Sequence, residues 1–272
     1  MLTRAITGFL FILTIIAGIY FNQYISMVLF TVIVLLGLDE FYGLVKKSKE
    51  IKPLKFWGTL TGFTLMLILC LAALDIISTK IIFIPVMMIF TTFLIELYRK
   101  KENPFTNVSY TILGMIYIVL PFAMLFHLGF YAENNFTTDY SFQIILGFFI
   151  MLWTNDTGAY LAGRFLGKHK LFERISPKKT WEGSFGGALL TIIAAYIFSI
   201  FFTNLELHNW IVIAILVAIF GGLGDLVESM LKRSLNIKDS GNILPGHGGI
   251  LDRFDGLFLS VPFIYSYLYL LS

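Results

Sequence analysis

The chain has 272 residues, of which 57% are hydrophobic and 14% are charged, and its mean hydropathy is +0.82. Soluble domains carry about 25% charged residues, so this composition excludes an ordinary soluble protein and indicates a polytopic membrane protein. The formal net charge of +3 decides little by itself. The single cysteine, Cys70, excludes an intrachain disulfide.

The first 20 residues, MLTRAITGFLFILTIIAGIY, have the hydropathy of a secretory signal peptide. They contain one basic residue and no clear small-x-small cleavage site, so we expect a retained helix. A helix that crosses the bilayer needs about 20 apolar residues. We therefore predict an all-α polytopic integral membrane protein with about nine transmembrane helices, at about 5–21, 24–38, 56–74, 81–98, 108–130, 142–163, 185–203, 210–230 and 251–271.

Basic residues distribute unevenly between the two sets of connections. If the N-terminus is cytoplasmic, the outer connections are 22–23, 75–80, 131–141 and 204–209, and Lys80 is the one basic residue among them. Lys and Arg concentrate in cytoplasmic loops. The asymmetry therefore predicts a cytoplasmic N-terminus and a C-terminus outside.

Three inner connections, 39–55, 164–184 and 221–255, are strongly polar, and a fourth, 99–107, is an ordinary basic stop. Residues 39–55 carry five lysines after an aromatic and apolar run, which predicts an interfacial segment beside anionic lipid headgroups. Residues 99–107 have the composition of a basic stop followed by a turn that contains proline. The other two polar regions are residues 164–184 and 221–255, and the second of these holds five carboxylates and seven glycines.

Two carboxylates fall within predicted membrane helices. Asp156 lies eight residues before Arg164, roughly 12 Å below the inner surface, and Asp225 lies at a similar depth of roughly 10 Å before Lys232. Charges at such depth are expensive. We expect a common water-filled cavity open to the cytoplasm, with Glu228 on the same helical face as Asp225; a structural polar pair is the alternative.

Asp252 and Asp255 are three residues apart at the expected start of the last helix, so both should lie on one face of its first turn. With Asp225 they offer three hard oxygen ligands of the kind that Mg²⁺ prefers. Capping of the helix N-terminus is the alternative role. The four histidines and one cysteine show no zinc spacing.

Basic residues and glycines accompany these carboxylates. Ser176-Pro177 has the pattern of an N-cap followed by proline in the first helical position, which would aim N–H groups and the lysines after it at an anion. Pro245–Gly249 is a loop with few side chains, where backbone N–H groups can approach phosphate, and its His247 suits a hydrogen-bond donor. Taken singly, each lysine is also what the inner-loop rule demands.

The run SMLKRSLNIKDSGNILPGHGGILDRFD, Ser229 to Asp255, resembles the signature of phosphatidate cytidylyltransferases, the CDP-diacylglycerol synthase family. The segment from Asn155 through Gly187 also resembles the family, with Arg174 where many members have proline. The resemblance covers about 150–256. It matches the pattern at Ser229, Lys232, Arg233, Lys238, Asp239, Gly241, Pro245, His247, Gly248, Gly249, Asp252, Arg253 and Asp255.

The resemblance implies the reaction CTP + phosphatidate → CDP-diacylglycerol + pyrophosphate with Mg²⁺, in a single membrane domain, 1–272. Residues 1–107 would be scaffold and 108–272 would carry catalysis, in the cell inner (plasma) membrane with the site facing the cytoplasm. The metal ligands would be Asp225, Asp252, Asp255 and Glu228. The other catalytic candidates are Lys232, Arg233 and Asp156, and the substrate-binding candidates are Asn155, Ser176, Lys178, Lys179, Lys238, His247, Gly248, Gly249 and Arg253.

Two rival functions stay open at this point. A CTP-dependent polyprenol kinase would need a base for a hydroxyl group, and Asp156 suits that role. An ion-coupled transporter would use membrane carboxylates as a relay, but no inverted repeat accompanies them. The expected partners are CTP, phosphatidate and membrane lipids, without nucleic acid; a second cation such as K⁺ and a homodimer are left open.

Overall fold

The computed structural model describes residues 2–48, 50–132, 134–235, 237, 241 and 248–272. Within this described part the chain is helical apart from two short two-stranded sheets. Seven helical segments are long and apolar enough to cross a membrane, and a shorter apolar helix spans Ile6–Tyr20. The predicted all-α membrane protein is therefore confirmed. The count of nine spans and the sidedness of the termini remain predictions.

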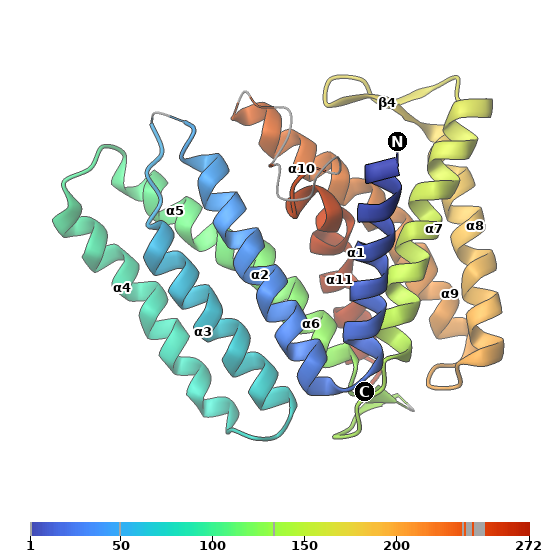
Figure 1. The fold of residues 1–272 in the computed structure, drawn as a ribbon, viewed down its shortest axis with the longest axis horizontal. Coiled ribbons are helices and arrows are strands. Elements are labelled where there is room, and N and C mark those ends of the chain that lie inside the picture. Colours follow the sequence, from blue (N-terminus) through green and yellow to red (C-terminus); the bar gives the residue numbers. More distant parts are fainter. Residues whose placement is uncertain (1, 49, 133, 236, 238–240, 242–247) are drawn as a thin grey trace. The chain divides into compact units, whose positions relative to one another are not determined.

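The chain divides into two compact units. Unit 1 comprises Met1–His127 and Leu235–Arg253, and unit 2 comprises Leu128–Ser234 and Phe254–Ser272. Figure 1 shows α3 of unit 1 between α2 and α4. The elements of unit 1 are α1 (Leu2–Tyr20), α2 (Gln23–Val45), α3 (Lys55–Ala73), the 3₁₀ helix η1 (Thr79–Ile82), α4 (Phe83–Arg99), α5 (Pro104–Gly114), the π-helix η2 (Met115–Val119) and α6 (Leu120–Leu128).

Unit 2 holds the remaining elements, and α11 (Leu251–Tyr269) begins in unit 1 and continues in unit 2. Figure 1 shows α7 and α8 side by side below the β3–β4 hairpin. The other elements are β1 (Tyr131–Ala132), β2 (Asn135–Phe136), α7 (Gln143–Leu166), β3 (Lys170–Phe172), β4 (Ser176–Thr180), α8 (Trp181–Phe201), α9 (Leu207–Leu216), the π-helix η3 (Val217–Gly221) and α10 (Gly222–Ser234).

The second helix corrects one prediction. It continues to Val45, well beyond the predicted end at 38, and its last residues are buried in unit 1. Tyr42 is fully buried and donates a hydrogen bond of 2.6 Å from its hydroxyl to the carbonyl of Thr111. A Cβ at Gly58 would lie 2.5 Å from the Tyr42 hydroxyl, so glycine makes room for the ring. The expected interfacial segment, 39–55, is therefore wrong at 40–45, which is packed inside unit 1, and the interfacial position of the lysines after it stays a prediction.

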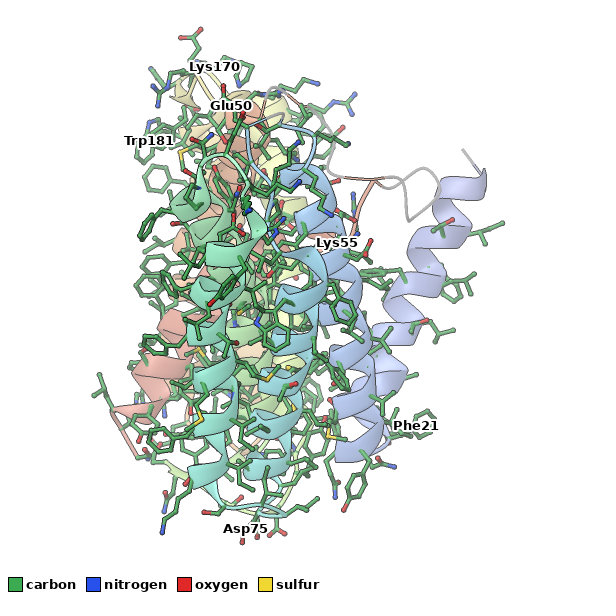
Figure 2. All side chains as sticks on the ribbon, turned by 90° about the vertical axis from the view of Figure 1, so that its left-hand side faces the viewer. Phe21, Glu50, Lys55, Asp75, Lys170 and Trp181 are labelled. Carbon is green, nitrogen blue, oxygen red and sulfur yellow. The ribbon has the colours of Figure 1, made fainter. Side chains whose placement is uncertain are left out.

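The connection from α2 to α3 is held by a buried polar group of unit 1. Asn107 accepts a hydrogen bond of 2.6 Å from the Lys52 N–H and donates one of 2.7 Å to Glu96. Glu96 is also ion-paired with Arg99 at 2.5 Å. Figure 2 shows Glu50 and Lys55 toward one end of unit 1 and Asp75 at the opposite end. Buried polar groups need such partners, so this network fixes one end of unit 1.

Small residues allow α7 and α8 of unit 2 to pack closely. A Cβ at Gly187 would lie 2.7 Å from Oδ1 of Asn155, and a Cβ at Gly183 would lie 2.8 Å from the carbonyl of Ala159. Small residues let membrane helices approach each other without a large hydrophobic driving force. The glycines after the predicted anion site therefore serve packing, and Asn155 is buried in this contact.

Candidate active site

Four carboxylates of unit 2 lie close enough for their charges to interact. The Asp255 carboxyl interacts electrostatically with Asp225, with Asp156 and, more weakly, with Glu228. These side chains come from α11, α10 and α7, so the fold gathers residues separated by about 100 positions in the sequence. We call these four residues the carboxylate cluster. Asp156 and Asp225 both interact with Asp255, and the shared water-filled cavity stays a prediction.

Glycines let α10 and α11 approach closely at the cluster. A Cβ at Gly224 would collide with the carbonyl oxygen of Asp255, so this position admits no side chain. A Cβ at Gly256 would lie 3.3 Å from the carbonyl of Gly221, at the end of η3. π-Helical turns often occur at functional sites. The glycines before Asp225 therefore bring the backbone of α10 against Asp255 and Gly256 of α11.

Asp225 is paired with a lysine from the β3–β4 hairpin. The Lys179 Nζ lies 2.7 Å from Oδ2 of Asp225 and donates a second hydrogen bond of 2.9 Å to the carbonyl of Gly222. The Ser229 hydroxyl is 3.3 Å from the other Asp225 oxygen. The Asp225 side chain is 42% exposed, so a charged ligand can reach it.

The second charge pair is more enclosed. Lys232 Nζ lies 2.5 Å from Oε2 of Glu228, one helical turn earlier in α10. The Glu228 side chain is 1% exposed and that of Lys232 is 14% exposed. A buried carboxylate needs a charged partner, so Glu228 holds Lys232 in place. Asp156, by contrast, is exposed, which fits a water-accessible position.

The β3–β4 hairpin overturns the predicted helix start at Ser176. Ser176 lies in β4 and pairs with Phe172 of β3, while α8 begins five residues later. Thr180 is the N-cap, and its hydroxyl accepts a hydrogen bond from the Gly183 N–H. Ser176 is paired in a strand and not at a helix start, so the Ser-Pro signal is not used for capping. The anion-binding helix start at Ser176 is therefore wrong.

Glu182 holds the residues just before β3, a role that the sequence did not predict. Its carboxylate accepts hydrogen bonds from the backbone N–H of Lys168 (3.1 Å) and His169 (3.2 Å), and it contacts the His169 Nδ1 at 2.6 Å. Lys178 and Lys179 are adjacent in β4, and side chains alternate along a strand. Lys178 is accordingly exposed, while Lys179 is partly buried at the cluster.

The signature segment in unit 1 is organised around the start of α11. The Gly249 N–H donates a hydrogen bond of 2.9 Å to Oδ2 of Asp252. Gly248 has a φ of +84°, and a Cβ there would lie 2.5 Å from the same oxygen. Asp252 therefore makes the capping contact that was its alternative role. By spacing, Asp255 lies on the same side of α11 as Asp252.

Glu40 is a second site residue that the sequence analysis missed. Its two carboxylate oxygens accept hydrogen bonds from the N–H groups of Ile250 (2.7 Å) and Leu251 (3.2 Å). The available signal was its position on the apolar face of α2, four residues from Leu44 and three from Gly37. A buried carboxylate on such a face needs a donor.

Of four further predicted residues, two are exposed and two lie outside the described part of the chain. Arg233 and Arg253 are exposed. Lys238 and His247 lie outside the described residues. Across 2–235 and 248–272, as far as these residues are described, no three His, Cys, Asp or Glu side chains are grouped to hold a metal ion. The carboxylate cluster contains hard oxygen donors. One of them, Asp225, is already paired with Lys179.

The matching family model and three curated relatives of this chain are all cytidylyltransferases. A model described as "Cytidylyltransferase family" matches residues 2–271. A phosphatidate cytidylyltransferase of Bacillus subtilis (strain 168) is 42% identical over 174 residues, which cover 64% of this chain and 62% of that protein. Those of Staphylococcus haemolyticus (strain JCSC1435) and Staphylococcus aureus (strain COL) are 41% and 38% identical over 167 residues, 61% of this chain and 60% of each relative. The matched segment spans about three fifths of these relatives.

Proposed function

This chain belongs to the cytidylyltransferase family, and we propose that it transfers the cytidylyl group of CTP to phosphatidate, forming CDP-diacylglycerol and pyrophosphate in phospholipid biosynthesis. The observation that carries the proposal is the carboxylate cluster, with Lys179 and Lys232 paired to two of its members. Acidic residues beside basic ones suit a reaction between polyphosphate and a second phosphate. The names of the relatives support the choice of CTP and phosphatidate as substrates.

The reaction requires no strong general base. A phosphate oxygen of phosphatidate attacks the α-phosphorus of CTP, a new P–O bond forms, and the bond to the β-phosphate oxygen breaks, so pyrophosphate leaves with the bonding electrons. The nucleophile is already an anion, so no proton must be removed. The two substrates repel each other, and catalysis must therefore position them and neutralise charge.

Two lysines suit charge neutralisation. The Lys179 ammonium lies at the cluster and is 25% exposed, so it can exchange Asp225 for a phosphate oxygen. Lys232 is held by Glu228 on the same helix as Asp225. Arg233 and Lys178 are exposed nearby in sequence, and they would extend the cationic surface toward the pyrophosphate leaving group.

Carboxylate oxygens are the ligands that a hard divalent cation prefers, but the described carboxylates are not grouped around one metal position, so a cation would have to draw them together. Asp225 and Asp255 would hold Mg²⁺, with Asp156 and Glu228 acting through water, and Asp252 is the further ligand that the signature suggests. Bound Mg²⁺ would neutralise phosphate charge and act as a Lewis acid at the α-phosphate. Lys179 would turn from Asp225 to substrate when a cation takes its place.

We place the site on the cytoplasmic face of the cell membrane. The distribution of Lys and Arg in the sequence supports this sidedness. CTP is a soluble anion, and the exposure of Asp156 and Asp225 is compatible with access from water. Phosphatidate would reach the same place from the bilayer, since the surrounding helices are apolar.

The experiment uses the purified chain in detergent with CTP, Mg²⁺ and one lipid at a time. Phosphatidate should yield CDP-lipid and pyrophosphate in equal amounts, whereas diacylglycerol, which lacks the phosphate, should yield neither. EDTA should stop the reaction and added Mg²⁺ should restore it. Phosphorylation of a polyprenol would instead identify a kinase. Ion flux in liposomes without turnover of any lipid would identify a transporter.

A further inference from the structure

The residues just before α11 offer no side chain that could cap the N–H groups of Ile250 and Leu251, since the local acceptor Asp252 is bonded to Gly249. Ser, Thr, Asp and Asn are the side chains that best satisfy the free N–H groups at a helix start. Ile250, which immediately precedes α11, has no such group, and Gly249 before it has no side chain. The N–H groups of Ile250 and Leu251 are buried, so water cannot replace a cap.

Glu40 supplies the missing acceptor from another helix. Its carboxylate is 7% exposed, and each oxygen receives one N–H of the α11 start, at 2.7 Å and 3.2 Å. A carboxylate at a helix N-terminus also interacts favourably with the helix dipole. Hydrogen bonds to a charged group are stronger than neutral ones. The contact therefore joins two segments that are 210 residues apart in the sequence.

The same contact determines where Asp252 lies. Asp252 accepts the Gly249 N–H, one residue before the two N–H groups that Glu40 holds. A Cβ at Gly241 would lie 3.0 Å from the Glu40 carboxyl, so the signature segment approaches Glu40 at a second point. Movement of residues 249–251 would therefore move the Asp252 carboxylate.

The helix that carries Glu40 is firmly packed. The neighbouring Phe41 and Tyr42 are fully buried in unit 1. A Cβ at Gly37, one turn before Glu40, would lie 3.8 Å from the side chain of Ile250. α2 thus offers a rigid base from which a single side chain can hold the signature segment.

We propose that Glu40 is a positioning residue of the transfer reaction: it caps α11 from α2 and thereby holds Asp252 in its working position. The predicted effect on catalysis rests on the proposed function. The capping of α11 by Glu40 does not depend on that function. Glu40 would touch neither substrate. Its removal should lower kcat more than it changes KM, because the residue that it positions, Asp252, would act mainly on the transition state.

The test compares Glu40→Gln with Asp39→Asn in the full-length protein. Asp39 is the adjacent residue, and its exposed carboxylate forms an ion pair of 2.6 Å with Lys55, so this control removes one negative charge without touching α11. Glutamine keeps the size of the side chain but has one acceptor oxygen for two N–H groups. Hydrogen exchange of the peptide around residues 248–258, the unfolding temperature, kcat and both KM values would be measured.

Glu40→Gln should speed exchange at Ile250 and Leu251 by at least about tenfold, lower kcat by at least about thirtyfold and change each KM by less than about threefold. Asp39→Asn should change the exchange rates, kcat and both KM values by less than about twofold and should leave the unfolding temperature at the wild-type value. Glu40→Asp, which keeps the charge on a shorter side chain, should fold and lose less kcat than Glu40→Gln; it carries the test if Glu40→Gln cannot be purified.

Two outcomes would overturn the proposal. Unchanged exchange in Glu40→Gln would show that the cap is not formed, and faster exchange with wild-type kcat would show that the cap does not position the site. If the wild-type protein does not turn over phosphatidate, the proposed function fails instead. The exchange measurement then still decides whether Glu40 caps α11.

Discussion

The substitution Asp225→Asn separates a catalytic role of the cluster from a structural one. The asparagine has the same shape and keeps one oxygen that can accept from Lys179, now 2.7 Å from Asp225. It removes the negative charge from the member of the cluster that acts most strongly on Asp255. We expect the protein to fold normally and to lose turnover.

Asp225→Asn should change stability little and turnover greatly. The Asp225 side chain is 42% exposed, so its ion pair contributes at most about 1 kcal/mol to stability. Removal of repulsion from the other carboxylates offsets part of that loss. The unfolding temperature should therefore change by less than about 4 °C. Turnover should fall by at least about 10³-fold, which corresponds to about 4 kcal/mol of transition-state stabilisation.

The assay measures CDP-lipid formation and thermal unfolding on the same preparation. Asp39→Asn is the matched control, because it breaks an ion pair of 2.6 Å that lies outside the cluster. Its activity and unfolding temperature should both match the wild type. Turnover within threefold of wild type in Asp225→Asn would refute the catalytic role. A loss of activity that only parallels a large fall in stability would refute it as well.

Three further substitutions test other parts of the account. Gly224→Ala should destabilise the protein by about 2 kcal/mol or more and abolish activity, because its Cβ would collide with the backbone of Asp255; thermal unfolding at wild-type temperature would contradict this. Asp252→Asn should fold yet abolish CDP-lipid formation, and wild-type turnover would remove it from the metal ligands. Lys46→Ala, at the exposed end of α2, should retain at least half of the wild-type rate; a large loss would mean that the α2–α3 connection belongs to the site.

Hydropathy was sufficient to predict most of the helices, because length and apolar composition decide which segments cross a bilayer. It failed at the end of α2. Residues 39–55 have the composition of an interfacial segment, yet within them Tyr42 donates a buried hydrogen bond to the carbonyl of Thr111. A tertiary hydrogen bond of this kind leaves no local trace in the sequence.

The candidate site was predictable where charge and depth were informative. Asp156 and Asp225 stand out because charges are rare within membrane segments, and the fold brings both to Asp255. Ser176 was misleading because two residues, Ser176 and Thr180, have the chemistry of an N-cap. Only the pairing of β4 with β3 decides between them.

Glu40 was not predictable from its surroundings in the sequence. Next to Asp39 and ahead of five lysines, it has the composition of a solvated loop. Its function depends on N–H groups 210 and 211 residues away, where a helix begins without its own cap. Its spacing from Gly37 and Leu44 and the absence of a capping side chain at Gly249 and Ile250 are two separate signals, but neither identifies the other as its partner.

The most direct measurement follows the phosphorus atoms of CTP. The purified protein would be incubated with phosphatidate and Mg²⁺, once with CTP labelled at the α-phosphate and once with CTP labelled at the γ-phosphate. Attack on the α-phosphorus predicts that the α label enters the lipid product and that all of the γ label leaves as pyrophosphate. Recovery of the γ label in lipid, or of neither label, would contradict cytidylyl transfer.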